Sequence, residues 1–190
     1  MHAPDLQRIV VAIDPAVSSH EGSDETGIIV AGKDANGHGW VIEDLSGRYD
    51  PATWAKIAVA AYHRHGADRI VAEANQGGDM VENTLRAFDA NLSYSKVHAS
   101  RGKFTRAEPI AALYEQGRVH HVGLFPQLED QMTSFVPDID RGKMGSPDRV
   151  DALVWAMTEL MVARVPFEFL LEMYRRETAE AKARQVEAAQ

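Results

Sequence analysis

The sequence of 190 residues contains no cysteine, which excludes a disulfide framework and a metal site built on thiolates. It has no apolar run long enough to span a membrane, and its N-terminus lacks the pattern of a signal peptide. No Gly-x-x-x-x-Gly-Lys-Ser/Thr motif occurs, so the loop that cradles nucleotide phosphates is absent. We therefore expect an intracellular protein with no membrane association.

Positive charge is scarce overall, because the formal net charge is -8 at pH 7. The field of the whole chain therefore does not favour nucleic acid. Basic residues nevertheless gather in the segment between Asp89 and Glu108, which holds no acidic residue. The basic residues of this segment are Lys96, Arg101, Lys103 and Arg106. Such a segment suits a phosphate-backbone ligand, and an ordinary solvated loop explains it equally well.

Hydrophobic patterning predicts one domain over residues 1–166, followed by a helix-prone tail over 167–190. Strands are expected at 8–13, 26–32, 39–45, 69–73, 93–98 and 119–122. Helices are expected at 51–66, from Gly77–Gly78 to Phe88, and at 103–117, 126–135 and 146–163, with a loop at 137–146. This order predicts an α/β fold with a mixed sheet, an antiparallel meander plus parallel strands, and helices on both faces.

Local signals fix several details of this prediction. Asp50 is expected to cap the helix that begins at Pro51, and Ser146 to cap the last one. His120 and His121 are adjacent on a strand, so they should face opposite sides. The large aromatic residues Trp54 and Trp155 are expected in the core.

Three acidic residues stand where apolar stretches end. Asp14 follows Ile-Val-Val-Ala-Ile, Glu73 follows Arg-Ile-Val-Ala, and Asp151 precedes Ala-Leu-Val-Trp-Ala. A carboxylate at the end of a buried strand is costly unless a positive charge compensates it. Hard divalent cations take carboxylate oxygens, and two such ions serve phosphoryl chemistry. We predict a site for Mg²⁺ or Mn²⁺, with Asp14 bridging two ions and Glu73 and Asp151 each holding one.

Asp148 is a fourth candidate ligand. It lies three residues before Asp151, so both point from the same face of the helix. An acid in the first turn of a helix also interacts favourably with the helix dipole, which explains Asp148 without any metal. Asp14 or Glu73 alone is as easily explained by a salt bridge or a turn cap. The metal hypothesis depends on the acids acting together.

Five blocks of sequence, in order, resemble the C-terminal nuclease domain of phage terminase large subunits. The resemblance covers about residues 8–163. The blocks are Ile-Val-Val-Ala-Ile-Asp-Pro, Asp-Glu-Thr-Gly-Ile-Ile-Val-Ala-Gly, Val-Ala-Glu-Ala-Asn-Gln-Gly-Gly-Asp, Lys-Phe-Thr-Arg-Ala-Glu-Pro-Ile-Ala-Ala-Leu-Tyr-Glu-Gln-Gly-Arg-Val and Asp-Arg-Val-Asp-Ala-Leu-Val-Trp-Ala.

This resemblance implies an RNase H-like fold and a metal-dependent endonuclease that cuts concatemeric viral DNA during packaging. The family's catalytic acids fall on Asp14, Glu73 and Asp151, and Asp148 falls where relatives carry a further acid or a histidine. The Lys-x-x-Arg of the family falls on Lys103 and Arg106, which implies contacts with the DNA backbone. We expect Arg101, Arg141 and Lys143 to add to that DNA-binding surface.

The family resemblance also implies partners. Expected partners are double-stranded DNA, a terminase ATPase motor domain, a small terminase subunit and a portal, in the cytoplasm of the bacterial host. Because the phosphate-binding loop is absent, DNA translocation is not expected of this chain, which is either a piece of a longer protein or a separately encoded nuclease.

Three alternatives stay open at this point. Another RNase H-like nuclease, such as a junction resolvase, would use the same acids. An actin-like or sugar-kinase ATPase also begins with a strand ending in Asp, but it needs a Gly-rich turn where this chain has Pro-Ala-Val-Ser-Ser. A non-catalytic assembly module would dock to a portal or a motor through the tail 167–190.

Overall fold

The computed structural model describes residues 2–16, 25–73, 78–99, 102–135 and 146–162. Its strands are β1 (Leu6–Asp14), β2 (Gly27–Asp34), β3 (Gly39–Asp44), β4 (Arg69–Glu73), β5 (Tyr94–Val97) and β6 (Val119–His121). Its helices are α1 (Pro51–Arg64), α2 (Gly78–Arg86), α3 (Lys103–Glu115), α4 (Pro126–Ser134) and α5 (Asp148–Met161).

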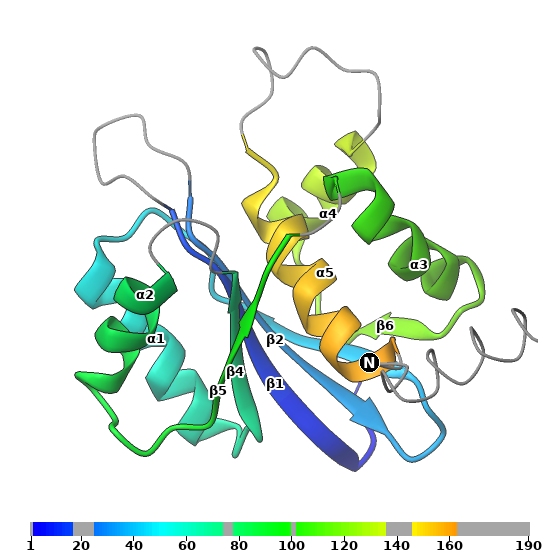
Figure 1. Cartoon of the computed structure of the whole chain (residues 1–190). Helices are drawn as coiled ribbons and strands as arrows, with labels where there is room; N and C mark the ends of the chain where they lie inside the picture. The colour runs from blue at the N-terminus through cyan, green and yellow to red at the C-terminus, as the bar shows by residue number, and fades with distance from the viewer. Residues whose placement is uncertain (1, 17–24, 74–77, 100–101, 136–145, 163–190) are drawn as a thin grey trace, which may run out of the picture.

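The six strands form one mixed sheet in the order β5-β4-β1-β2-β3-β6 (Figure 1). Strands β1, β2 and β3 make an antiparallel meander. Strand β4 pairs parallel to β1, β5 parallel to β4, and β6 parallel to β3. The predicted mixed sheet is therefore confirmed, and the expected element boundaries differ by only a few residues.

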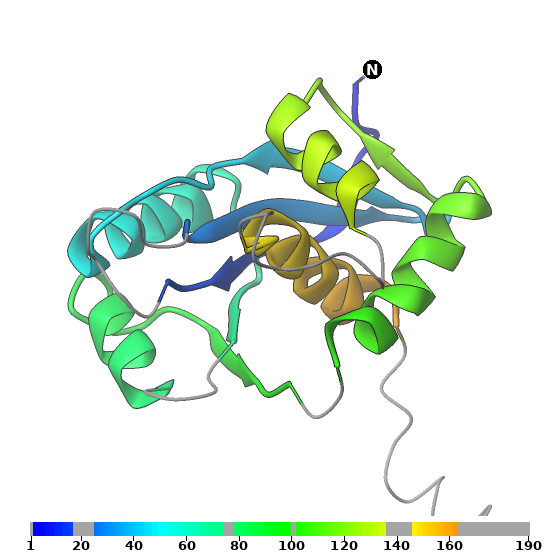
Figure 2. The same cartoon turned by 90° about the horizontal axis from the view of Figure 1, so that it is seen from above.

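Alternating residues of the central strands build two apolar layers. Val10 and Ala12 of β1 face the layer that contains α3, α4 and α5, whereas Val11 and Ile13 face the layer of α1 and α2. The view from above shows helices on both sides of the sheet (Figure 2). The same alternation turns Asp14, the last residue of β1, towards the α5 side.

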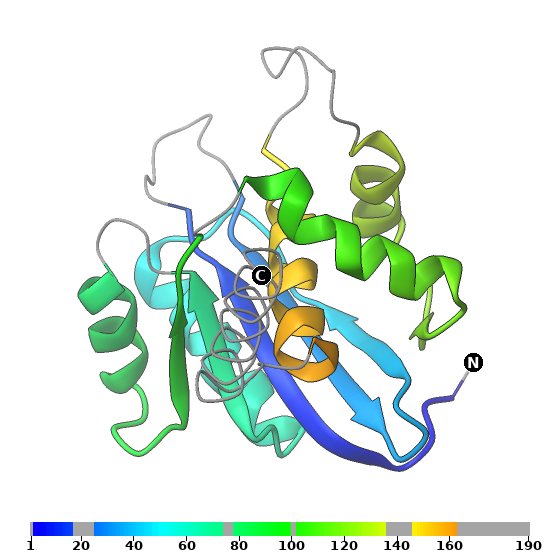
Figure 3. The same ribbon diagram turned by 45° about the vertical axis from the view of Figure 1, so that its right-hand side comes forward.

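Helix α5 lies directly against the sheet, as the rotated view shows (Figure 3). Its first turn approaches β2 at Gly27, where a Cβ atom would stand 2.0 Å from the carbonyl oxygen of Asp148. Only a glycine permits so close an approach of the helix backbone. Gly27 also pairs in register with Asp14, so this contact places the start of α5 beside the end of β1.

The helix starts confirm one predicted cap and correct the other. Asp50 caps α1, accepting a hydrogen bond from the backbone N–H of Thr53 at 2.8 Å. Ser146 does not cap α5: Pro147 occupies the N-cap position, and no side chain there accepts a hydrogen bond. Tertiary contacts of the first turn hold this helix start instead. The predicted loop 137–146 (apart from Ser146) and the tail 167–190 lie outside the described residues.

His120 and His121 contact different groups, as their adjacency on a strand predicted. The Nε2 atom of His120 lies 2.8 Å from Nδ1 of His38, whereas His121 contacts the Tyr114 hydroxyl and the Glu129 carboxylate. Within the described residues, no helix is long and apolar enough to cross a membrane.

Candidate functional site

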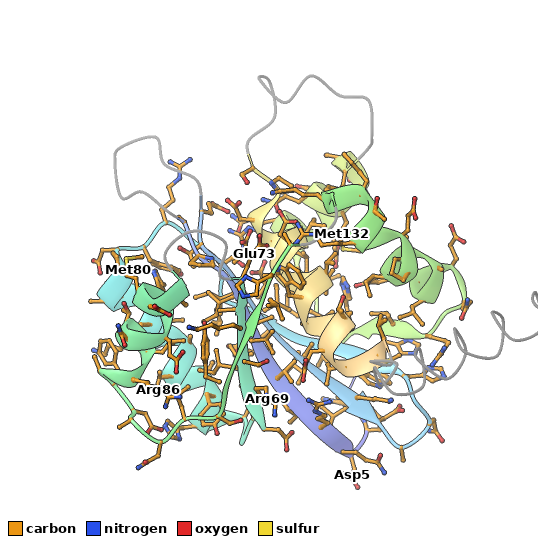
Figure 4. All side chains as sticks on the ribbon, in the orientation of Figure 1. Asp5, Arg69, Glu73, Met80, Arg86 and Met132 are labelled. Atoms are coloured by element: carbon orange, nitrogen blue, oxygen red, sulfur yellow. The ribbon has the colours of Figure 1, made fainter. Side chains whose placement is uncertain are left out.

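Two neighbouring parallel strands and one helix bring the predicted acids to one end of the sheet. Ile13 of β1 pairs with Ala72 of β4, so Asp14 and Glu73, the next residue in each strand, lie at the same end of the sheet. Figure 4 shows Glu73 at this end of β4, and Arg69 at the other. Asp148 and Asp151 come from the first turn of α5. The close contact of this turn with Gly27 places it at the same end of the sheet.

Glu73 is held by two side chains from different elements. The indole N–H of Trp155 in α5 donates to Glu73 Oε2 across 2.7 Å, and Arg106 Nη1 in α3 donates to the same oxygen across 3.2 Å. Two donors on one oxygen fix the direction of this carboxylate, and hydrogen bonds to an ionised group are stronger than those between neutral groups.

Asp151 is engaged by two cations from α3. Its side chain is buried, and its oxygens contact the ammonium of Lys103 and, at 3.6 Å, Nη2 of Arg106. The Arg106 guanidinium stacks on Trp155, with Cζ 4.5 Å from the ring centroid. Only 11% of the Arg106 side chain is exposed, against 36% for Lys103. Arg106 is therefore fixed between two acids, and Lys103 reaches them from the solvent side.

Two of these acids have raised pKa values. Burial, together with the negative charges of Asp151, Glu73 and Asp148, raises the pKa of Asp14 to about 8, although Lys103 opposes this. Burial also raises the pKa of Asp151 despite its contacts with Lys103 and Arg106. Four carboxylates thus lie close enough for strong mutual repulsion, which two neighbouring cations only partly relieve.

The residue types fit a hard divalent cation, because all four donors are carboxylates. Burial and repulsion from neighbouring acids raise the pKa of Asp14, and a bound cation would relieve that repulsion. In the observed side-chain conformations, no group of three or more His, Asp or Glu residues among those described is arranged to hold a metal ion. Lys103 and Arg106 occupy oxygens of Asp151 and Glu73 instead. A metal ion bound at these oxygens would have to displace Lys103 and Arg106 from them.

The residues predicted to bind DNA are only partly described. Lys103 and Arg106 lie in the first turn of α3, directly at the acidic cluster. Arg101, Arg141 and Lys143 lie outside the described residues. The stretch from Lys96 to Arg106 therefore includes at least two cations that contact acids of the site.

Sequence reasoning missed two residues that shape the site. Trp155 is buried, as predicted, but its indole also bonds Glu73. Arg149 is buried in the first turn of α5 and pairs with Asp44 and Glu25. A signal for Trp155 existed, because Asp148, Asp151, Trp155 and Glu159 follow helical spacing and form one stripe of hydrogen-bonding side chains in a largely apolar helix.

Comparisons with known proteins identify the fold. A family model described as the terminase RNaseH-like domain matches residues 11–160. The chain belongs to this family. The resemblance inferred from the five sequence blocks is thereby confirmed. No curated protein matches the sequence.

Solved structures of phage terminases share the fold. The large terminase nuclease of thermophilic phage G20c, solved with bound zinc, has a TM-score of 0.63 at 18% identity, over 83% of this chain and 84% of that one. The nuclease domain of the large terminase subunit of bacterial virus Sf6 has a TM-score of 0.59 at 15% identity, over 85% and 91%. The HK97 bacteriophage large terminase has a TM-score of 0.60 at 14% identity, over 83% of this chain and 41% of that one. These likenesses establish the RNase H-like fold.

Proposed function

We propose that this chain is a divalent-metal-dependent endonuclease that cuts concatemeric viral DNA during genome packaging. The observation that carries the proposal is the convergence of four carboxylates, with the pKa of Asp14 raised to about 8 by burial and by its acidic neighbours. A perturbed cluster of this kind at the ends of strands is typical of a functional site. Membership of the terminase RNaseH-like family supports the choice of DNA as substrate.

The proposed cofactor is Mg²⁺ or Mn²⁺, bound as two ions. Structures of the phage G20c nuclease carry zinc, magnesium or cobalt, which supports use of a divalent metal here. Asp14 would bridge the two ions, Glu73 and Asp151 would each hold one, and Asp148 would assist. Two such ions, when bound, supply an activated water and stabilise the leaving oxygen of a phosphodiester.

The chain's own residues orient this chemistry. Trp155 and Arg106 hold the Glu73 carboxylate in one direction, and burial keeps bulk water from Asp151. Lys103, with 36% of its side chain exposed, would exchange Asp151 for a DNA phosphate. Arg106 would add positive charge from a fixed position. Arg101, Arg141 and Lys143 complete the proposed backbone contacts.

The proposed setting is the phage packaging machine in the cytoplasm of the bacterial host. A terminase ATPase motor domain, the small terminase subunit and the portal are the proposed partners, with double-stranded DNA as the common substrate. The proposed nuclease domain covers residues 1–166, and the proposed tail 167–190 extends from it. Movement of DNA would belong to the motor.

A plasmid-nicking assay with Mg²⁺, Mn²⁺ or EDTA tests the proposal. We expect cleavage with either metal and none in EDTA, and Asp14→Asn should abolish it. The matched control is Asp5→Asn, an exposed acid at the opposite end of the sheet from Glu73 (Figure 4), which should cleave normally. Full nicking by Asp14→Asn would refute the assignment of the site.

Two comparisons separate this function from its alternatives. Plain duplex and four-way junctions should be cleaved at similar rates, whereas a strong preference for junctions would favour a resolvase. Deleting 167–190 should leave cleavage unchanged. A chain that never cleaves DNA yet binds a portal or a motor would instead be an assembly module.

A further inference from the structure

Arg149 is a buried cation that the proposed chemistry does not use. It stands between Asp148 and Asp151 in the first turn of α5, and only 5% of its side chain is exposed. Its Nη1 donates to Asp44 Oδ2 across 2.7 Å, and its Nε and Nη2 lie 3.1 and 3.0 Å from Glu25 Oε2. The guanidinium therefore joins α5 to the end of β3 and to the residues that lead into β2.

The position of Arg149 is unfavourable for a cation in isolation. The N-terminus of a helix carries partial positive charge, so a basic residue in the first turn opposes the helix dipole. Burying a guanidinium also has a desolvation cost unless it is paired and hydrogen-bonded. Both costs are offset by Asp44, whose side chain is 6% exposed, and by Glu25. The bidentate fork of arginine suits two such carboxylates, which a lysine would match less well.

These contacts fix how the first turn of α5 sits on the sheet. The backbone N–H of Arg149 donates to Oε1 of Gln131 in α4 at 3.1 Å, and Gly27 admits the Asp148 carbonyl on the sheet side. Since successive helical residues are rotated by about 100°, Arg149 leaves the helix on a different side from Asp148 and Asp151. Anchoring one side of the turn therefore sets the direction in which the two acids point.

We infer that Arg149 is a positioning residue for the acidic centre: through Asp44 and Glu25 it holds Asp148 and Asp151 in register with Asp14 for metal binding. This inference rests on the proposed function. Residues that orient metal ligands typically contribute 10- to 100-fold to metal affinity. Loss of the anchor should accordingly weaken metal binding by about tenfold or more, and reduce kcat for DNA cleavage more than it raises KM.

The test is the affinity of the intact chain for Mn²⁺, measured by titration calorimetry without DNA. Two variants are compared with wild type: Arg149→Lys, which keeps the charge but loses the fork, and Arg149→Gln combined with Asp44→Asn, which leaves no unpaired buried charge. The matched control is Arg8→Gln, because Arg8 pairs with the buried Glu159 at the other end of the same helix. Circular dichroism melting shows that each variant is folded at the assay temperature.

We expect the double variant to bind Mn²⁺ at least about tenfold more weakly, Arg149→Lys to fall between it and wild type, and Arg8→Gln to bind normally at a comparable melting temperature. Wild-type affinity in both folded Arg149 variants would overturn the positioning role and leave the proposed function intact. Equal weakening in Arg8→Gln would also overturn it, because helix anchoring in general would then be the cause. Absence of Mn²⁺ binding in wild type would overturn the proposed function together with this inference.

Discussion

Trp155 and Glu73 are joined by a hydrogen bond of 2.7 Å from the indole N–H to the carboxylate, which links α5 to the end of β4. The same indole ring supports the guanidinium of Arg106, which contacts Glu73 and Asp151. One aromatic side chain thus packs in the core and also orders two acids and a cation. Trp155 therefore connects the apolar layer between α5 and the sheet directly to the acidic centre.

Replacing Trp155 with Phe should affect stability and cleavage together. Phe keeps most of the apolar bulk but loses the N–H donor, and a hydrogen bond to a charged group contributes about 1.5–3 kcal/mol. We expect the free energy of unfolding to fall by about that amount, measured by urea denaturation, and the nicking rate to fall at saturating metal.

Trp54→Phe is the control for Trp155→Phe, because Trp54 belongs to α1 and is buried in the layer on the opposite side of the sheet. It should lower stability without changing the nicking rate of the folded protein. Equal effects of both substitutions on nicking would mean that the bond to Glu73 has no part in cleavage.

Asp14→Asn should change how stability depends on pH in metal-free buffer. Burial and the neighbouring acids raise the pKa of Asp14 from 3.8 to about 8. The folded protein therefore holds this proton more tightly than the unfolded chain. The resulting stabilisation is complete below pH 3.8 and is lost as pH rises towards about 8.

Over that window we expect the wild-type free energy of unfolding to decrease by up to about 1.4 kcal/mol per pH unit. Asp14→Asn should flatten this slope and melt at a higher temperature than wild type at pH 8. Melting curves in EDTA at several pH values measure both. A wild-type slope unchanged in the variant would show that another group is responsible.

Lys103→Met should weaken DNA binding and raise repulsion among the acids. Lys103 contacts Asp151, and the charge and hydrogen bond of Asp151 raise the pKa of Lys103 although burial opposes this. Without the ammonium, the melting temperature in EDTA should fall, and added Mn²⁺ should raise it more than in wild type.

Duplex affinity of Lys103→Met, measured by fluorescence anisotropy in EDTA, should decrease, and its salt slope should become shallower by about 0.9. Lys56→Met, an exposed change on α1 at the opposite face, should alter neither. An unchanged salt slope in Lys103→Met would show that Lys103 does not contact the DNA backbone.

Gly27→Ala should displace the start of α5. The added Cβ would lie 2.0 Å from the Asp148 carbonyl oxygen and 3.0 Å from the Ala152 Cβ. Backbone atoms cannot rotate away as a side chain can, and overpacking of this kind costs about 1–3 kcal/mol. We expect lower stability and weaker Mn²⁺ binding, measured by denaturation and calorimetry.

Gly32→Ala tests the same change elsewhere on β2. There the nearest atom is the tip of the Leu6 side chain at 2.6 Å, which can turn aside. Its stability loss should be smaller, and its Mn²⁺ affinity normal. A Gly27→Ala protein with normal affinity would show that the close approach is not needed for the site.

Patterns along the chain were enough to predict most of the fold. Apolar runs marked the strands, and the turn after Asp34 marked the hairpin between β2 and β3, where the Asp34 carboxylate accepts the N–H groups of Asn36 and His38. The start of α5 was predicted less well. Ser146 has the chemistry of a cap, but that turn is held by Gly27 and Gln131 of other elements and by the ion pairs of its own Arg149. Capping rules describe only local contacts.

By itself, the sequence determined which residues could carry the chemistry: acids at the ends of strands and at the start of a helix, and a basic segment with Lys103 and Arg106. Those are local properties of composition and spacing. Only the tertiary structure decided the pairing of Glu73 with Trp155 and of Asp151 with Lys103, and the anchoring of α5 through Arg149. Such partners lie 48 to 124 positions apart, so no local pattern encodes them, and packing of the helices on the sheet brings them together.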